Sequence, residues 1–194
     1  MADTLKIGGV LMAAGSGKRF GSNKLASEFR GQSLFLHALN AIPVHELDSV
    51  AVVTQYPEFA ESVKEYRFAV IFNDSPESGQ SHTLHLGVQA LQHCDGILFQ
   101  VADQPLLRRE SVAALIQLWR TQPDKIAALA HGGKRGNPCL FPARFYPELL
   151  AITGDRGGSA VIRNHPEELL LLEVAEEELL DVDTVEALNE LKHL

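Results

Sequence analysis

Short, almost continuously apolar stretches alternate with stretches of helical periodicity along this chain. Four of the apolar stretches are rich in Val, Ile and Phe, and they span residues 6–14, 49–55, 68–73 and 96–102. Strands of a parallel sheet are covered on both faces, so their sequences are nearly continuous in apolar residues. The pattern therefore predicts four buried parallel strands.

Helical periodicity fills the segments between and after these strands. In residues 81–94 and 111–119, apolar side chains recur at intervals of three to four residues, which places them on one helix face. Strands separated by helices of this length imply right-handed βαβ connections. We expect an α/β fold, a Rossmann-like sandwich with a mostly parallel sheet covered on both sides.

The second half of the chain is less regular. Residues 126–130 predict another strand, and residues 131–139 a turn-rich excursion. Residues 140–152 are typical of a strand end that leads into a helix. In residues 181–194, Val185, Leu188 and Leu191 have helical spacing, which predicts a closing helix.

Length and composition indicate one ordinary globular domain over residues 1–194. Of the 194 residues, 45% are hydrophobic and 22% are charged, and no linker or charge block divides the chain. The net charge of −8 argues against nucleic acid as a partner, because nucleic-acid binding needs a basic face. Lys18, Arg19 and Lys24 nevertheless form a local basic cluster, which suggests a small phosphorylated ligand.

Cysteine usage and hydropathy predict a cytoplasmic protein with no membrane partner. Cys94 and Cys139 lie far apart and form no CxxC pair, so neither a disulfide framework nor a zinc site is indicated. The first apolar run is too short for a signal peptide, and no segment approaches the roughly 20 apolar residues of a membrane span.

The segment LMAAGSGKRFGSNKL, residues 11–25, has the composition of a phosphate-binding loop after a strand. A Walker A loop is excluded because Met12 stands where its first Gly should be and Arg19 replaces the Ser or Thr that holds magnesium. The dinucleotide fingerprint GxGxxG fits poorly because Phe20 occupies the place of its third Gly.

The loop of nucleotidyltransferases that activate small molecules with a nucleoside triphosphate fits the whole segment. We predict nucleotide contacts from Ala13, Ala14, Gly15, Ser16 and Gly17, whose backbone N–H groups would face the phosphates. Arg19 and Lys24 would neutralise the β- and γ-phosphates and the pyrophosphate that leaves.

Two acidic motifs could supply metal ligands. Asp103 follows the strand predicted at 96–102, at the sheet edge where ligands bind in open α/β folds, and an Asp there can hold magnesium. It could instead cap the turn that Pro105 enforces. Asp181 and Asp183 precede the closing helix, where Asp183 and Glu186 also fit an N-cap with its capping-box partner.

The predicted helix at 81–94 begins with a second candidate binding element. Gly79 and Ser81 lie where free N–H groups and a hydroxyl would suit a base, a ribose or a phosphate, although Ser81 could simply cap the helix. His82 and His85 are three residues apart, but no acidic residue nearby completes a metal site, so we do not include them.

Taken together, the chain resembles the small nucleotidyltransferases of molybdenum cofactor maturation, and within them the cytidylyltransferases that join CMP to the phosphate of molybdopterin. The resemblance covers nearly the whole chain and rests on five stretches in the family's order: AAGSGKRFGSNKL, SGQSHTLHLGVQAL, VADQPLL, GNPCLFPARFYPELLAITGDRGG and DVDTVEAL.

The resemblance implies a single-domain nucleotidyltransferase sandwich and assigns roles to these stretches. It places magnesium on Asp103 and Asp183, with Asp181 the weaker candidate, and nucleotide contacts at Gly79 and Ser81. It implies that two tight bends contact the acceptor. The first bend contributes Gly136, Asn137 and Pro138, and the second contributes Asp155 and Gly157. Asn137 stands where the family usually has His, so a titrating group is not available there.

The implied reaction transfers CMP from CTP to molybdopterin or the molybdenum cofactor, with release of pyrophosphate. Arg19, Lys24 and Asp103 would be catalytic, Mg²⁺ would be the cofactor, and an apo-molybdenum hydroxylase could receive the product. Two alternatives stay open: a guanylyl or sugar-1-phosphate nucleotidyltransferase, and a molybdenum cofactor chaperone without chemistry.

Overall fold

A computed structural model describes residues 5–15, 20 and 23–193, and its main feature is one seven-stranded sheet. The strand order is β5-β4-β1-β6-β8-β7-β9. In chain order these strands are β1 (Ile7–Ala13), β4 (Ser49–Thr54), β5 (Ala69–Phe72), β6 (Gly96–Val101), β7 (Ile126–His131), β8 (Lys134–Pro142) and β9 (Leu169–Glu173).

All strand pairs of this sheet are parallel except those of β8, which runs antiparallel to both β6 and β7. The predicted mostly parallel sheet is therefore confirmed. The four strands predicted in the first half are present, each ending within about one or two residues of the predicted bounds. The predicted burial is wrong for β5, which lies at the sheet edge and has no buried residue.

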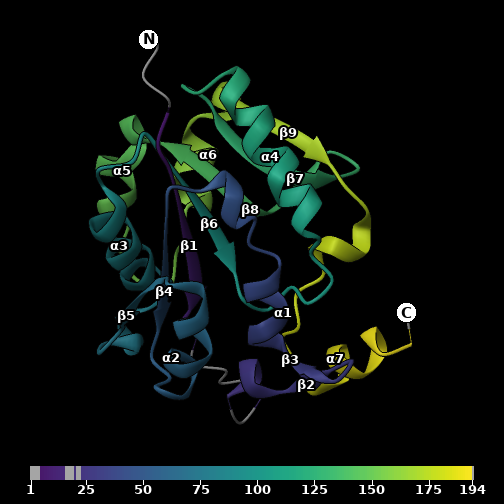
Figure 1. Cartoon of the computed structure of the whole chain (residues 1–194). Coiled ribbons are helices and arrows are strands. Elements are labelled where there is room, and N and C mark those ends of the chain that lie inside the picture. The colour runs from purple at the N-terminus through teal and green to yellow at the C-terminus, as the bar shows by residue number, and fades with distance from the viewer. Residues whose placement is uncertain (1–4, 16–19, 21–22, 194) are drawn as a thin grey trace.

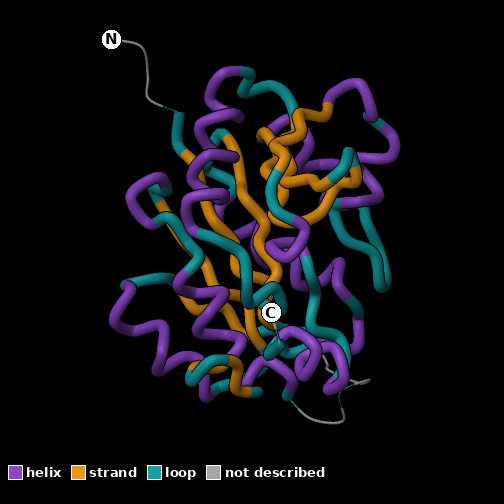
Figure 2. The backbone as a smooth tube through the Cα atoms, turned by 90° about the vertical axis from the view of Figure 1, so that its right-hand side faces the viewer, coloured by secondary structure: helices purple, strands orange, loops and turns teal. Residues whose placement is uncertain are grey.

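Helices cover both faces of the sheet, as Figures 1 and 2 show. Their bounds are α1 (Leu34–Asn40), α2 (Glu58–Val63), α3 (Gln80–Leu91), α4 (Arg109–Thr121), α5 (Tyr146–Leu150), α6 (Ser159–Asn164) and α7 (Val185–Leu191). Both helices predicted at 81–94 and 111–119 are confirmed as α3 and α4.

Successive side chains along the central strands point to opposite faces of the sheet, so each strand contributes to the core on both faces. Val10 packs in a cluster with α3, α5 and α6, whereas Leu11 packs in a cluster with α1 and α2 on the other face. In β6, Ile97 belongs to the first of these clusters and Leu98 packs with α4. Apolar residues are needed on both sides of each strand, which explains the continuous apolar runs in the sequence.

The turn-rich excursion predicted at residues 131–139 is wrong. Gly132 and Gly133, with φ of +55° and +76°, form a tight turn, and β8 begins directly after it. The first half of β8 is polar because it is only partly buried, and its pairing with β6 and β7 is long-range. Residues 169–173 form β9, a sheet-edge strand that the pattern did not predict.

The pairing of β8 with β7 contains a bulge at residues 136–138. Its register shifts between the pairs Ala128↔Cys139 and Ala130↔Arg135, so Leu129 alone lies opposite three residues of β8. The tight bend expected at Gly136, Asn137 and Pro138 is therefore a bulge within a strand. The Asn137–Pro138 peptide bond is cis.

A small accessory layer closes the lower end of the molecule in Figure 1. Strands β2 (Glu28–Phe29) and β3 (Gln32–Ser33) form a hairpin beside α7, the predicted closing helix. Phe29, Leu34, Val182, Leu188 and Leu191 form one buried cluster that joins these parts. Within the described residues, no helix has the length and apolar character needed to cross a membrane.

Candidate functional site

The strand order reverses direction at β1, because β4 and β5 lie on one side of it and β6 on the other. In open α/β sheets, a crevice forms at the carboxyl ends of the strands that flank such a reversal. A cavity of about 470 Å³ lies there. Its lining residues are Met12, Ala14, Gly15, Lys24, Leu25, Pro76, Gly79, Gln80, Thr83, Val101, Asp103, Asp155 and Asp183.

The loop after β1 forms the floor of the cavity and is held by residues that follow one another at the end of β4. Ala14 and Gly15 line the cavity, whereas Ala13, the last residue of β1 and also a predicted nucleotide contact, is buried and does not line it. Each of three side chains donates one hydrogen bond to one loop carbonyl: Thr54 to Ala13 at 3.0 Å, Gln55 to Ala14 at 2.9 Å and Tyr56 to Gly15 at 2.8 Å. The predicted Ser16, Gly17 and Arg19 lie outside the described residues.

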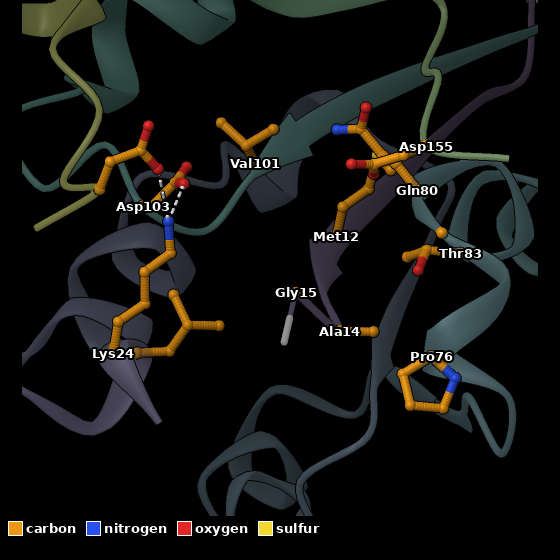
Figure 3. A pocket seen from close by; sticks show the side chains of 13 residues that line it. Met12, Ala14, Gly15, Lys24, Pro76, Gln80, Thr83, Val101, Asp103 and Asp155 are labelled. Atoms are coloured by element: carbon orange, nitrogen blue, oxygen red, sulfur yellow. Dashed lines mark hydrogen bonds and ion pairs between the residues drawn. The ribbon is translucent and has the colours of Figure 1, made fainter. Parts of the chain in front are cut away.

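Lys24 projects into the cavity from a short 3₁₀ turn. Asn23 caps this turn by accepting from the Leu25 N–H at 3.2 Å, and the buried Leu25 side chain anchors it in the core. Figure 3 shows Lys24 reaching Asp103, whose Oδ2 lies 2.6 Å from Lys24 Nζ, and Asp183 Oδ1 lies 3.2 Å from the same nitrogen.

The Lys24 side chain is only 12% exposed, so the two carboxylates largely determine whether its amine is protonated. Burial alone would lower the pKa of Lys24, but the charge of Asp103 and hydrogen bonds to Asp103 and Asp183 outweigh it and raise that pKa. The ammonium is therefore fully protonated at neutral pH.

A backbone contact brings the two acidic motifs together. The Val182 N–H donates to the Asp103 carbonyl at 2.8 Å, and the Val182 side chain is buried. Asp183 does not cap the closing helix, because Thr184 Oγ1 accepts from the Ala187 N–H at 3.1 Å in that role. The N-cap alternative for Asp183 is wrong.

The Asp103 carboxylate is oriented toward the cavity rather than toward a turn. Its Oδ2 accepts from Lys24, and its Oδ1 is buried without a hydrogen-bond partner among the described residues. A turn cap would need a backbone N–H donor to this carboxylate, and none is present in the described part of the chain. A buried carboxylate oxygen without a donor is suited to a metal ion, because carboxylates are preferred ligands of Mg²⁺.

Asp181 adds further negative charge beside this pair. Although the residue as a whole is exposed, desolvation of its carboxyl group and the nearby charges of Asp103 and Asp183 raise the pKa of Asp181 to about 6. Among the described residues no group of three or more side chains could hold a metal ion, so Asp181 does not complete a metal site with Asp103 and Asp183. Asp103 and Asp183, which Lys24 bridges, are the two carboxylates that could contribute to one.

The opposite wall of the cavity consists of the start of α3 and the loop 153–158, seen in Figure 3 around Gln80, Thr83 and Asp155. Gly79 has a φ of +87°, and a Cβ atom there would lie 2.6 Å from the carbonyl carbon of Gly154. The Ser81 N–H donates to the Gly154 carbonyl at 3.2 Å. The loop is therefore held directly against the helix start.

The structure contradicts two predictions for Ser81, its role as the N-cap of this helix and its place in the binding site. Ser81 does not cap α3, since the helix begins at Gln80 with Gly79 as its N-cap, and the buried Ser81 side chain does not line the cavity. Gln80 and Thr83 line it instead. The sequence could have indicated this, because residues three apart on the first turn of a helix lie on the same face.

A second cavity of about 160 Å³ adjoins the first and shares Met12, Gln80 and Val101 with it. Its other lining residues are Leu84, Phe99, Arg135, Asn137, Cys139, Phe141, Gly157, Gly158 and Ser159.

The structure distributes the predicted acceptor residues between the two cavities. Asn137 and Gly157 line the smaller cavity, and Asp155 lines the larger one. Gly136 and Pro138 line neither of them: Gly136 packs against Leu179, and Pro138 is buried. The sequence analysis missed Arg135 and Ser159, and no local pattern marks either residue. His82 and His85 do not form a cluster of three or more metal-binding side chains with any described residue.

Sequence comparison finds relatives that match most of this chain. It is 29% identical over 167 residues to the purine catabolism protein PucB of Bacillus subtilis, covering 80% of each protein. It is 29% identical over 197 residues to the nicotine blue oxidoreductase of Paenarthrobacter nicotinovorans, covering 94% of this chain and 95% of that protein. A "Probable molybdenum cofactor guanylyltransferase" of B. subtilis is 26% identical over 143 residues, which cover 72% of this chain and 69% of that protein.

Solved structures share the fold at lower identity. A nucleotidyl transferase from Methanothermobacter has a TM-score of 0.81 at 20% identity, with 97% of this chain and 96% of that chain covered. A manganese complex of Rv0371c from Mycobacterium tuberculosis has a TM-score of 0.77 at 20% identity, with 97% and 98% covered.

The model of one family, described as the MobA-like NTP transferase domain, matches residues 9–169. This span includes the loop after β1, the start of α3 and Asp103, which form most of the larger cavity. The predicted nucleotidyltransferase family is thereby confirmed, whereas the match does not distinguish the cytidylyl branch within it. Together with the switch-point cavity and the shared fold, the match shows that this chain belongs to the MobA-like NTP transferases.

Proposed function

We propose that this chain transfers CMP from CTP to the phosphate of molybdopterin or the molybdenum cofactor, with release of pyrophosphate. The observation that carries the proposal is the contact of Lys24 with Asp103 and Asp183 at 2.6 Å and 3.2 Å, inside a cavity of about 470 Å³ at the sheet's switch point. This contact brings together an ammonium group that can bind phosphates and two carboxylates that can bind a metal ion.

Asp103 and Asp183 would hold the divalent cation, and the manganese complex of a protein with the same fold supports this role. A magnesium ion bound there would neutralise charge on the triphosphate and on the leaving pyrophosphate. Lys24 occupies this position in the structure, between the two carboxylates. When metal and nucleotide bind, we propose that the Lys24 ammonium moves from the carboxylates to the phosphates.

The donor nucleotide would lie between the loop after β1 and the start of α3. Ala14, Gly15, Gly79, Gln80 and Thr83 line this part of the cavity. Gln80 and Thr83 carry donors and acceptors that can read a base edge or a ribose. Arg19, Ser16 and Gly17 keep their predicted roles at the phosphates.

The acceptor would enter from the smaller cavity, whose residues Asn137 and Gly157 were predicted to contact it. A phosphate monoester is already ionised near neutral pH, so its oxygen can attack the α-phosphorus without a strong general base. Catalysis then depends on in-line positioning and on charge stabilisation.

The base preference is the sharpest test of this proposal. Steady-state pyrophosphate release would be measured with CTP, GTP and ATP, with molybdopterin as acceptor and Mg²⁺ present. We expect the highest kcat/KM for CTP, because the acceptor-side stretches resemble the cytidylyl branch more than the guanylyl branch. Small residues leave room for a larger ring, so hydrogen bonds to the base edge would have to provide the discrimination. A GTP value equal to or above that for CTP would assign the chain to the guanylyl alternative, which the B. subtilis relative supports.

A further inference from the structure

Arg135 carries the one charged side chain among the described residues that line the smaller cavity. It lies on β8 immediately before the bulge, paired with Ala130 of β7. The regular pairing of β8 with β7 is interrupted directly after Arg135, and Arg135 lines the cavity together with Asn137 and Cys139.

The contacts of Arg135 are with neutral groups. Its Nη2 donates to Ser159 Oγ at 2.9 Å, and its Nη1 lies 3.6 Å from Cys139 Sγ. Burial raises the pKa of the Cys139 thiol more than Arg135 lowers it, so the thiol is uncharged at neutral pH.

No carboxylate of the described residues lies within ion-pair distance of the Arg135 guanidinium, and no Asp or Glu of that part of the chain lines the smaller cavity. A guanidinium has five N–H donors, of which two are used here. A partly buried cation without a counterion is costly, and an anionic ligand would remove that cost.

The remaining walls suit the body of a ring-bearing ligand. Leu84, Phe99 and Phe141 contribute apolar side chains to the lining of this cavity. The shared residues Met12, Gln80 and Val101 connect this space with the larger cavity. A molecule seated here can therefore extend toward the proposed nucleotide site.

We propose that Arg135, held by Ser159, is a specificity-determining residue that binds an anionic oxygen group of the acceptor. The oxygen that Arg135 contacts is not the phosphate oxygen that attacks the nucleotide. The inference rests on the proposed function, because it assumes that the smaller cavity takes the acceptor. Arg135 does not line the larger cavity, where Lys24 lies, which assigns it to the acceptor rather than to the triphosphate.

A binding experiment tests the anion site without any chemistry. The side-chain Nε–Hε signal of Arg135 would be assigned in the NMR spectrum of the full chain from its loss in Arg135→Lys, and inorganic phosphate would be titrated as the probe. We expect a saturable shift of this signal, weakened several-fold in Ser159→Ala because the hydroxyl no longer orients the guanidinium. Absence of a saturable shift in the wild-type protein would overturn the inference.

A kinetic experiment separates acceptor from donor. Arg135→Gln should raise the KM for the acceptor about ten- to a hundredfold, as expected for loss of a charge-assisted hydrogen bond, and leave the KM for CTP within about twofold. Arg135→Lys should recover part of this loss. The matched control is Arg163→Gln, which removes an exposed arginine of α6 that lines neither cavity.

The two failures can be told apart. An unchanged acceptor KM in Arg135→Gln, or a rise in the KM for CTP instead, overturns the role of Arg135 in an active enzyme. If the wild-type protein releases no pyrophosphate with any triphosphate, the proposed function fails, while the phosphate titration still decides whether Arg135 binds an anionic oxygen group.

Discussion

Among single residues, Lys24 shows how the site is organised before any ligand arrives. Its ammonium is mostly buried and is held by Asp103 and Asp183, which lie 79 and 159 positions away along the chain. Because the ammonium already lies in the cavity, the reorganisation that we propose on nucleotide binding is the movement of this one side chain from the carboxylates to the phosphates.

We expect Lys24→Ala to lower turnover by about ten- to a hundredfold, because one charge-assisted contact to the phosphates contributes about 1.5–3 kcal/mol. Steady-state pyrophosphate release would measure this. Lys64→Ala is the matched control, since Lys64 is 69% exposed and pairs only with Glu61 within the described residues. Equal turnover in Lys24→Ala and wild type, with the fold intact, would remove Lys24 from the mechanism.

The sequence predicts a site residue that lies close to the end of a strand. It does not predict site residues that meet only through long-range packing of the chain. Asp103 lines the cavity at the sheet edge, as its position two residues after the recognisable buried strand β6 suggests. Arg135 and Ser159 meet at 2.9 Å although they are 24 residues apart. Their contact joins β8 to the start of α6, and no local pattern in the sequence suggests that the two side chains meet.

At the level of elements, the start of α3 and the loop 153–158 act as one wall because their backbones are in direct contact. Gly79 makes this possible: it has a φ of +87°, and a Cβ would lie within 2.8 Å of three backbone atoms of Gly154 and Asp155. The helix could be predicted from its periodicity. The contact of the loop with the helix could not, because contacts between backbones leave no pattern of apolar residues in the sequence.

Gly79→Ala should therefore destabilise the fold by about 1–3 kcal/mol through steric overlap, in addition to the strain of its φ. Gly31→Ala is the control that isolates the overlap, because Gly31 has a φ of +82° but a Cβ added there would have no other atom within 4 Å. Chemical denaturation of both variants would give the two free energies of unfolding. Equal losses would show that the loop moves away without cost.

Over the whole molecule, the two acidic motifs join the centre of the sheet to the C-terminal part of the chain. Asp103 follows β6, whereas Asp183 precedes α7, which packs on the β2–β3 hairpin. A metal ion bound by both would add to the existing links between these parts, which include the Val182–Asp103 backbone contact and the Lys24 bridge between the two carboxylates.

Binding of Mn²⁺ should therefore stabilise the folded protein as a whole. At about a hundredfold excess over its Kd, a ligand of the folded state adds about 2.7 kcal/mol to the free energy of unfolding. Denaturation of wild type and of Asp103→Asn, each with and without Mn²⁺, would measure this. We expect stabilisation of the wild-type protein alone, and equal stabilisation of both proteins would show that the ion binds elsewhere.

The three hydrogen bonds from the end of β4 to the loop after β1 have a consequence for the electric field of the cavity. The carbonyls of Ala13 and Ala14 both point toward donors on Thr54 and Gln55. In a trans peptide the N–H points opposite to the C=O, so two successive peptide dipoles are aligned with their positive ends away from β4. This partial charge belongs to the main chain and does not titrate, so it is equally strong at every pH at which the loop keeps this conformation.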